Sequence, residues 1–357
     1  ILKSMKKNIA YLFLFLFISS PTYPQNWLQE GETVVGNDSD LLGEDVEMSG
    51  DGNTMAVGAR LNDANGLPQS GAVKIYRRTS DGVWTQLGQT IGGVNEYDQS
   101  GASVSLSYDG NTVAIGSPYY GRGNGLVRVF YLNDFNTWSS IGEGISGIFN
   151  IEQIGHKDKV ALNGNGNRLV ISEYNDNMGI ASSVKVYERN GNNFSQIGLH
   201  ISEVSQNHTL DIDYGGNRIA IASYDETNEN GENAGTTRIY QLSGEYWTQE
   251  GENIYGESAG DYSGQAISFD TYANQIAIGS KYNSGNGFQS GHVRVFQRAY
   301  YGENDWRWIQ TGSDIDGNGE NDMFGSTVDI NNNKLVSGSQ SSGIIKTVSY
   351  THLRAHE

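Results

Sequence analysis

The stretch GASVSLSYDGNTVAIG at residues 101–116 indicates the fold of this chain more clearly than any other part of the sequence. A close copy, GEDVEMSGDGNTMAVG, stands at residues 43–58. The turn asparagine recurs at intervals of 58, 56, 50, 57 and 59 residues, as Asn53, Asn111, Asn167, Asn217, Asn274 and Asn333. Repetition with a period of this length is typical of repeat architectures, which use one supersecondary unit many times.

Each copy contains four short strand-like runs, named here runs a to d. Run a alternates polar and apolar residues and ends in a turn of the Asp-Gly-Asn kind, which favours a hairpin because Gly and Asn accept positive φ. Run b, residues 113–116 in the second copy, is apolar on both faces, as expected of a strand between two sheets. Run c, residues 127–130, alternates apolar with basic residues, which predicts that its Lys and Arg face water. Run d starts with an aromatic residue and ends with Gly, as from Trp138 to Gly142.

These runs predict an all-β fold, a β-propeller of four-stranded antiparallel blades. A sheet of this size cannot bury both of its faces alone, whereas radial packing of successive sheets buries them and ring closure protects the edges. Five full blades and part of a sixth can be traced in the sequence. A lone copy of run d at Trp27–Gly31 is expected to supply the fourth strand of the sixth blade, and a seven-bladed ring is the alternative.

Composition excludes several classes of function. The 357 residues carry a formal net charge of -18, opposite in sign to the charge of a nucleic-acid-binding protein. The absence of Cys excludes a disulfide scaffold, a thiolate zinc site and a Cys nucleophile. The 47 Gly, without a collagen triplet, indicate many tight turns between short strands.

The two ends of the chain do not fit the repeat. Met5 is followed by Lys6, Lys7 and an apolar run at residues 9–18, the pattern of a secretory signal peptide, with a buried core helix as the alternative. We therefore expect residues 1–26 to hold upstream residues and a signal peptide, residues 27–347 to form the propeller, and the protein to be secreted or on the cell surface. Residues 348–357 resemble a translated sequencing adapter and are expected to be a non-native tail, with a natural polar tail as the alternative.

Two short motifs point to a family. Phe324-Gly325 precedes run a, and Gly116-Ser-Pro118 follows run b. In this respect the chain resembles the FG-GAP repeat of integrin α-subunit propellers, and in particular the FG-GAP-like propellers of secreted bacterial surface proteins. The resemblance implies a seven-bladed propeller that recognises ligands on its loops and binds calcium in some a–b loops. Here those loops are short hairpins, without the alternating carboxylates that calcium requires.

One calcium candidate lies elsewhere. Asp314, Asp316, Asn318 and Asp322 match the alternate ligand positions at the start of a calcium-binding loop, with Gly319 at its sharp turn. The bidentate Glu at the twelfth position is missing, because Gly325 stands there. The favoured interpretation is therefore an acidic turn between blades, with no cofactor expected, and a Ca2+ ion at these residues is the alternative.

A second set of carboxylates recurs with the repeat. Asp40, Asp98, Asp261 and Asp322 each stand three residues before the Gly that opens run a. The favoured interpretation is that each side chain caps backbone N–H groups of a turn. A ring of metal or ligand sites is the alternative.

The b–c loops are long and differ from copy to copy. Variable loops on a rigid repeated scaffold often carry binding specificity. Aromatic and basic residues in these loops are candidates for stacking on a sugar or a peptide: Tyr119, Tyr120, Arg122, Tyr224 and Tyr282. The alternative is that these loops are ordinary solvated connectors.

Catalytic patterns are sparse. The histidines of the propeller fall on different types of run and form no recognisable triad or metal motif, and His292 is expected to be a surface strand residue. The sequence therefore predicts a non-enzymatic, monomeric extracellular module that binds a protein or glycan through its loops, without nucleic-acid binding or membrane insertion. The alternatives are a structural spacer and a glycan-active hydrolase or lyase whose carboxylates meet in the channel.

Overall fold

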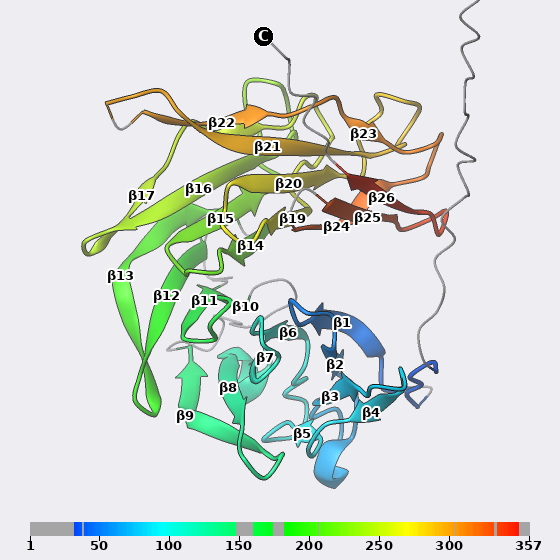
Figure 1. Cartoon of the computed structure of the whole chain (residues 1–357), viewed down its shortest axis with the longest axis vertical. Helices are drawn as coiled ribbons and strands as arrows, with labels where there is room; N and C mark the ends of the chain where they lie inside the picture. The colour runs from blue at the N-terminus through cyan, green and yellow to red at the C-terminus, as the bar shows by residue number, and fades with distance from the viewer. Residues whose placement is uncertain are drawn as a thin grey trace, which may run out of the picture.

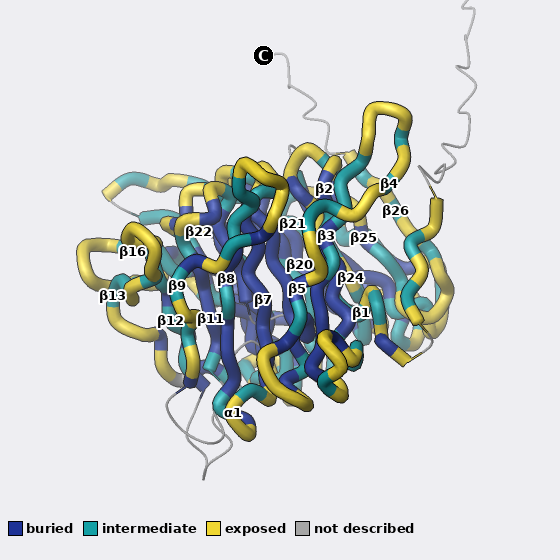
Figure 2. Tube along the Cα trace, turned by 90° about the horizontal axis from the view of Figure 1, so that it is seen from below, coloured by how far each residue is buried: buried dark blue, intermediate teal, exposed yellow. Residues whose placement is uncertain are grey.

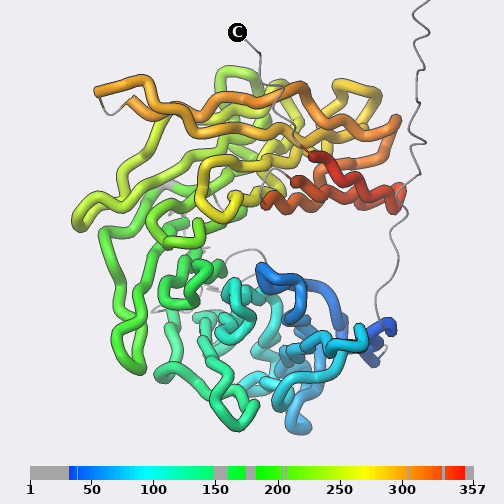
Figure 3. Tube along the Cα trace, viewed as in Figure 1, coloured from blue at the N-terminus to red at the C-terminus, as the bar shows by residue number. Residues whose placement is uncertain are grey.

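A computed structural model describes residues 32–37, 39–147, 160–173, 182–205, 207–303, 305–331 and 334–349. The described chain forms six antiparallel sheets that follow one another around a central axis, which confirms the predicted all-β propeller (Figure 1). Each sheet runs outward from the axis in chain order, so that its first strand is the innermost. Figure 3 shows the chain passing once around the ring from its first blade to its last.

The blades contain the following strands in chain order. Blade 1 holds β1 (Leu42–Met48), β2 (Thr54–Ala59), β3 (Ala72–Arg78), β4 (Trp84–Gln86) and β5 (Ile91–Gly92), and blade 2 holds β6 (Ser103–Leu106), β7 (Thr112–Ser117), β8 (Leu126–Leu132) and β9 (Trp138–Ser146). Blade 3 holds β10 (Val160–Leu162), β11 (Arg168–Glu173), β12 (Ser182–Asn190) and β13 (Asn193–Val204), and blade 4 holds β14 (His208–Ile212), β15 (Arg218–Ser223), β16 (Thr236–Ser243), β17 (Tyr246–Gln249) and β18 (Ile254–Tyr255). Blade 5 holds β19 (Ala266–Phe269), β20 (Gln275–Ser280), β21 (His292–Tyr300), β22 (Trp306–Gln310) and β23 (Ile315–Asp316), and blade 6 holds β24 (Phe324–Asn331), β25 (Lys334–Ser339) and β26 (Ile345–Ser349). Two short helical turns, η1 (Ala64–Gly66) and α1 (Tyr120–Gly123), lie in the β2–β3 and β7–β8 connections.

The Asp-Gly-Asn turns form hairpins, as predicted. In blade 1 the Asp51 carboxylate accepts hydrogen bonds from the Ser49 hydroxyl (2.6 Å) and the Asn53 backbone N–H (2.9 Å). The Ser49 hydroxyl oxygen in turn accepts the Thr54 N–H at 2.9 Å. Local side-chain acceptors therefore satisfy the backbone donors of the turn, which is why its sequence recurs.

The hydrophobic core is divided among the seams between blades. Five core clusters each join two successive blades, and the cluster between blades 1 and 2 includes Ile75, Val113, Ile115 and Trp138. Figure 2 shows β7 and β20 as buried along most of their length. The second strand of each of these blades is thus packed on both faces, as the apolar run b predicted.

Two recurring glycines explain how the blades approach each other. A Cβ on Gly58 would lie 2.1 Å from the Gly101 carbonyl oxygen, and a Cβ on Gly279 would lie 2.1 Å from that of Gly325. The Gly after run b and the Gly before run a of the next blade therefore meet backbone to backbone. Because Gly101 and Gly325 also have positive φ (89° and 86°), only Gly fits both requirements.

The aromatic residue of run d packs on the previous blade. The Trp138 indole donates to the Leu87 carbonyl at 2.8 Å, and a Cβ on Gly88 would touch its ring at 2.8 Å. Trp247 has the same relation to Ile197 and Gly198. The aromatic and the Gly of run d thus form contacts between successive blades.

Two predictions about polar side chains were wrong. The basic residues of run c do not all face water: Arg128 donates to the Gly92 carbonyl at 2.7 Å, and Arg294 is buried and donates to the Tyr255 carbonyl at 2.6 Å. His292 is not a surface residue, because only 1% of it is exposed. The connection from the previous blade contacts the start of the third strand at these places, through Gly92 in blade 2 and through Tyr255 and Glu257 in blade 5.

The sixth blade differs from the others in the described part of the chain. It contains three strands, and the residues predicted to supply the fourth, Trp27–Gly31, lie outside the described residues, as does the predicted signal peptide. The strand β26 continues through Val348 and Ser349, which pair with Leu335 and Lys334, and residues 350–357 lie outside the described residues. Across the described ranges, no helix has the length and apolar character needed to cross a bilayer.

Candidate functional site: the central channel

The six innermost strands surround a channel along the propeller axis. Its volume is about 860 Å3, and β1, β6, β10, β14, β19 and β24 all contribute to its walls. The described walls include acidic residues but no Lys, Arg or His. A cavity of this size on the axis of a rigid ring is the main candidate for a small-molecule site.

One position of the repeat places a ring of side chains in the channel wall. The residues of this ring are paired identically with the second strand of their own blades, and they are Glu47, Ser105, Ala161, Asp211, Ser268 and Asp329. Three of the six are acids, and Asp45 adds a fourth carboxylate two residues before Glu47 on β1. These four acids are here called the channel carboxylates: Asp45, Glu47, Asp211 and Asp329.

Side chains at this level also link neighbouring inner strands. Asp211 accepts the Phe269 N–H of the next blade at 2.7 Å and the N–H of its own neighbour Ile212 at 2.8 Å. Ser105 accepts the Leu162 N–H of the next blade at 3.0 Å. Hydrogen bonds between blades thus fix the direction in which these side chains point.

Glu47 differs from its equivalents. Glu47 is exposed to the channel, although the inner strands of all six blades enclose that channel. No hydrogen bond from a described residue to its carboxyl group is seen. Burial raises the pKa of Glu47 well above its usual value, and repulsion from Asp45, Asp211 and Asp329 raises it further. The Glu47 carboxyl group therefore holds its proton more strongly than an ordinary glutamic acid does.

Asp211 is shifted in the same direction. Burial raises its pKa to about 7, and hydrogen bonds from the Phe269 and Ile212 N–H groups limit the rise. A carboxyl group that titrates near neutrality can exchange a proton with a substrate at physiological pH. Two such groups in one channel can serve as an acid and a base.

Sequence reasoning named channel carboxylates only as a general possibility and missed these residues. Glu47 and Asp211 each stand six residues before a turn asparagine, Asn53 and Asn217, and an alignment of the copies on this asparagine brings them into register. The burial that shifts their pKa arises from the ring, which no single copy contains.

The predicted loop residues occupy three separate b–c connections. Tyr119, Tyr120 and Arg122 lie at or within α1, Tyr224 follows β15, and Tyr282 follows β20. The Tyr282 ring packs edge-on against Tyr262 at 5.5 Å. The five are not among the described residues that line the channel, and their binding of a ligand stays a prediction.

The repeated aspartates cap turns, as the favoured interpretation predicted. Asp98 accepts the Val94 and Asn95 N–H groups at 3.1 and 2.6 Å, and Asp261 accepts those of Glu257 and Ser258 at 3.1 and 2.9 Å. Asp322 accepts the Asn318 and Gly319 N–H groups at 2.6 and 3.2 Å. Asp40 differs, because it accepts the side-chain amides of Asn37 and Asn62.

The predicted calcium residues are placed in different environments. Asp322 uses one carboxylate oxygen, Oδ2, in its turn, and Asp316 belongs to the short strand β23. Asp314 instead lies beside Glu257 and His292. A calcium ion bound jointly by Asp314, Asp316, Asn318 and Asp322 stays a prediction.

Comparison with known proteins supports the fold. No protein-family model matches the chain, and no curated protein sequence does. Among solved structures, a candidate 6-phosphogluconolactonase from Bacteroides uniformis ATCC 8492 has a TM-score of 0.61 at 11% identity, covering 90% of this chain and 84% of that one. The periplasmic gluconolactonase of Pseudomonas aeruginosa has a TM-score of 0.54 at 13% identity (87% and 81% covered). A candidate 6-phosphogluconolactonase from Bacteroides fragilis NCTC 9343 has a TM-score of 0.55 at 10% identity (87% and 80% covered).

These comparisons correct the predicted function. A non-enzymatic binding module was expected, but the similar structures carry the names of lactonases, which are hydrolases. Those names agree with the hydrolase alternative better than with a binding module. Because identity is 10–13%, the similarity itself shows the fold alone, and the activity has to be argued from the channel.

Proposed function

We propose that the protein is a hydrolase that opens a small carbohydrate-derived lactone in its central channel. The observation that carries this proposal is the group of channel carboxylates, two of which have a raised pKa. Perturbed carboxyl groups that converge in a cavity are characteristic of acid–base sites. The names of the similar structures agree with this reaction class.

The two perturbed groups have complementary roles in the proposed reaction. Deprotonated Asp211 accepts a proton from water as the water oxygen bonds to the lactone carbonyl carbon. Protonated Glu47 donates a hydrogen bond to the developing oxyanion. The ring C–O bond then breaks, its oxygen takes the proton held by Asp211, and the hydroxy acid leaves.

The charge of the channel narrows the class of substrate. Its described walls combine several carboxylates with no basic residue, and the whole chain has a net charge of -18. A phosphorylated substrate would be repelled from such walls. We therefore propose a neutral sugar lactone, not a phosphorylated one, as the substrate.

The test is a pH-stat assay on neutral and phosphorylated sugar lactones, read against spontaneous opening. Asp211→Asn removes the general base and Glu47→Leu removes the hydrogen-bond donor, so each should lower kcat by about 100-fold or more. The matched control is Asp134→Asn, an exposed acid in the β8–β9 turn, which should leave kcat unchanged. The proposal is wrong if no lactone is opened above background, or if both channel variants keep full activity. A parallel panel of glycosides tests the broader glycan-active alternative.

We propose that the repeat is of the FG-GAP-like type, which is supported by the backbone contact between the Gly after run b and the Gly that precedes run a. We also propose a secreted or cell-surface location, supported by the pattern at residues 5–20 and by the periplasmic gluconolactonase among the similar structures.

A further inference from the structure

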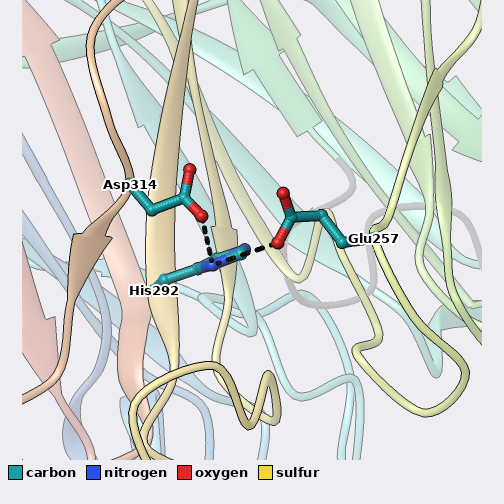
Figure 4. A group of neighbouring side chains, drawn as sticks. All are labelled: Glu257, His292 and Asp314. Carbon is teal, nitrogen blue, oxygen red and sulfur yellow. Dashed lines mark ion pairs between the residues drawn. The ribbon is translucent and has the colours of Figure 1, made fainter.

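Three potential metal ligands meet away from the channel, at the seam between blades 4 and 5. Glu257 lies in the β18–β19 connection, His292 opens β21, and Asp314 immediately precedes β23. Figure 4 shows the two carboxylates on either side of the imidazole ring. One ligand atom of each residue lies within 4.8 Å of those of the other two.

The spacing of these atoms is too wide for direct hydrogen bonds. His292 Nδ1 lies 3.5 Å from Asp314 Oδ2 and 3.8 Å from Glu257 Oε2. Nitrogen–oxygen hydrogen bonds are shorter, about 2.7–3.2 Å. Two ligands that are each about 2.1 Å from a tetrahedral metal ion lie about 3.4 Å apart, which is close to the observed spacing.

The environment of the His292 imidazole supports a metal site independently of the two acids. The His292 side chain is 1% exposed, its Nδ1 faces the two carboxylates, and its buried Nε2 has no hydrogen-bond partner among the described residues. The pKa of His292 is lowered to about 4, chiefly by burial and also by the Arg294 guanidinium, against the attraction of Asp314. With its proton on Nε2, the imidazole has a lone pair on Nδ1 available for a metal.

The surroundings of the cluster are mainly acidic. Burial raises the pKa of Glu257, and repulsion from Asp314, Asp261 and Asp316 adds to the rise against the attraction of Arg294. The Arg294 guanidinium lies 3.8 Å from the other oxygen of Glu257, and one of its nitrogens donates to the Tyr255 carbonyl. An arginine makes the same kind of backbone contact at the equivalent place in blade 2, so Arg294 belongs to the repeat.

The repeat itself shows that a blade does not need these three side chains. In blade 4, Thr236 stands in the place of His292, and Asn253 stands in the place of Asp314. In the connection after blade 1, Val94 stands in the place of Glu257. The three potential ligands therefore occur together at the seam between blades 4 and 5, although other seams of the propeller form without them.

We propose that Glu257, His292 and Asp314 bind a divalent first-row transition-metal ion, such as Zn2+ or Mn2+, at the seam between blades 4 and 5. A mixed imidazole and carboxylate donor set favours these ions over Ca2+, which prefers a larger shell of oxygen atoms. Glu257 and Asp314 are 41% and 28% exposed, so the ion reaches them from solvent while His292 holds it from the buried side. Asp314 is oriented through its other oxygen, which accepts the Gln310 amide at 2.7 Å.

The test measures binding of Zn2+, Mn2+ and Ca2+ to the untagged full chain by titration calorimetry, with metal content read after dialysis. One Zn2+ or Mn2+ per chain is expected, with a rise in Tm on binding. His292→Thr and Asp314→Asn, which introduce the residues of blade 4, should each weaken binding at least tenfold and abolish the rise in Tm. Asp305→Asn, an acid of the same blade outside the cluster, should bind as the wild type does.

The variants distinguish this metal site from the predicted calcium loop and from the absence of a metal site. An unfolding curve of each variant, recorded in the presence of a chelator, shows whether the metal-free variant is folded. If a variant is not folded, Glu257→Gln in the exposed connection is tested in its place. Absence of Zn2+ and Mn2+ binding at millimolar concentration, or equal binding by all variants, overturns the proposal. Preference for Ca2+ with loss on Asp316→Asn would instead identify the calcium loop predicted from the sequence. None of these readouts depends on lactone hydrolysis.

Discussion

Single carboxylates have three different roles in this molecule. Asp98 is buried and caps a turn through backbone N–H groups, so its role is structural and repeats with the blades. Glu47 stands on the channel wall without a described hydrogen-bond partner, and Asp314 lies beside a buried imidazole. The residue type is the same or similar in each case, and its surroundings decide what it can do.

The raised pKa of Asp211 predicts a pH dependence of stability. Its folded-state pKa is about 7, against an unfolded value near 3.8, so the folded state binds more protons between these values. The free energy of unfolding that this group contributes therefore falls as pH rises from about 4 to 7, by about 4 kcal/mol as an upper bound.

Asp211→Asn should remove this contribution. Urea unfolding at several pH values should show the wild type losing stability relative to the variant up to pH 7, with a constant difference above it. Because other carboxyl groups titrate in both proteins, the difference between the two curves is the quantity to compare. Asp305→Asn removes an acid whose pKa is lowered by its hydrogen bond with Arg307, so this control should not reproduce the difference. Parallel curves for wild type and Asp211→Asn would contradict the assignment.

Blade contacts depend on glycines whose role the sequence pattern indicated but could not explain. Gly58→Ala should destabilise the protein by about 1–3 kcal/mol or more, because its Cβ would lie 2.1 Å from the Gly101 carbonyl oxygen. Chemical denaturation measures the change. Gly319→Ala is the matched control, because nothing lies within 4 Å of its Cβ, and it should be close to neutral. Equal effects of the two substitutions would show that backbone entropy, not contact between blades, dominates.

The ring as a whole depends on how its first and last blades are joined. Each of the other five seams has a hydrophobic core cluster, whereas no such cluster joins blades 6 and 1 within the described residues. Blade 6 also has three described strands. We propose that Trp27–Gly31 completes it, as the match of this segment to run d predicts.

A chain that begins at residue 32 should therefore unfold at a lower urea concentration than one that begins at residue 27. The reason is that β26 would keep an unpaired edge and the last seam would lose its aromatic contact. Removal of residues 350–357 is the control and should change little, since they are expected to be a non-native tail. If the two chains starting at residues 27 and 32 unfold together, these residues do not close the ring.

The sequence alone determined the architecture of this protein. The repeated Asp-Gly-Asn turns, the doubly apolar run b and the Trp and Gly of run d are local patterns, and each depends on chemistry within one blade or against its neighbour. The hairpins, the buried second strands and the contacts between blades that they predicted were confirmed in the described residues, whereas closure by Trp27–Gly31 stays a prediction. The expectation that Arg128, Arg294 and His292 face water was wrong, because residues of other connections cover them.

The candidate sites were decided by the tertiary structure. Glu47 and Asp211 come from blades 1 and 4 and share a channel only because the ring brings the inner strands together. Glu257, His292 and Asp314 are spread over three segments of two blades, with no motif spacing to reveal them. A site requires functional side chains to lie close together, and burial by neighbouring residues then shifts their pKa values. Both effects depend on residues that are distant in sequence. Local sequence patterns therefore predicted the propeller but not its candidate sites.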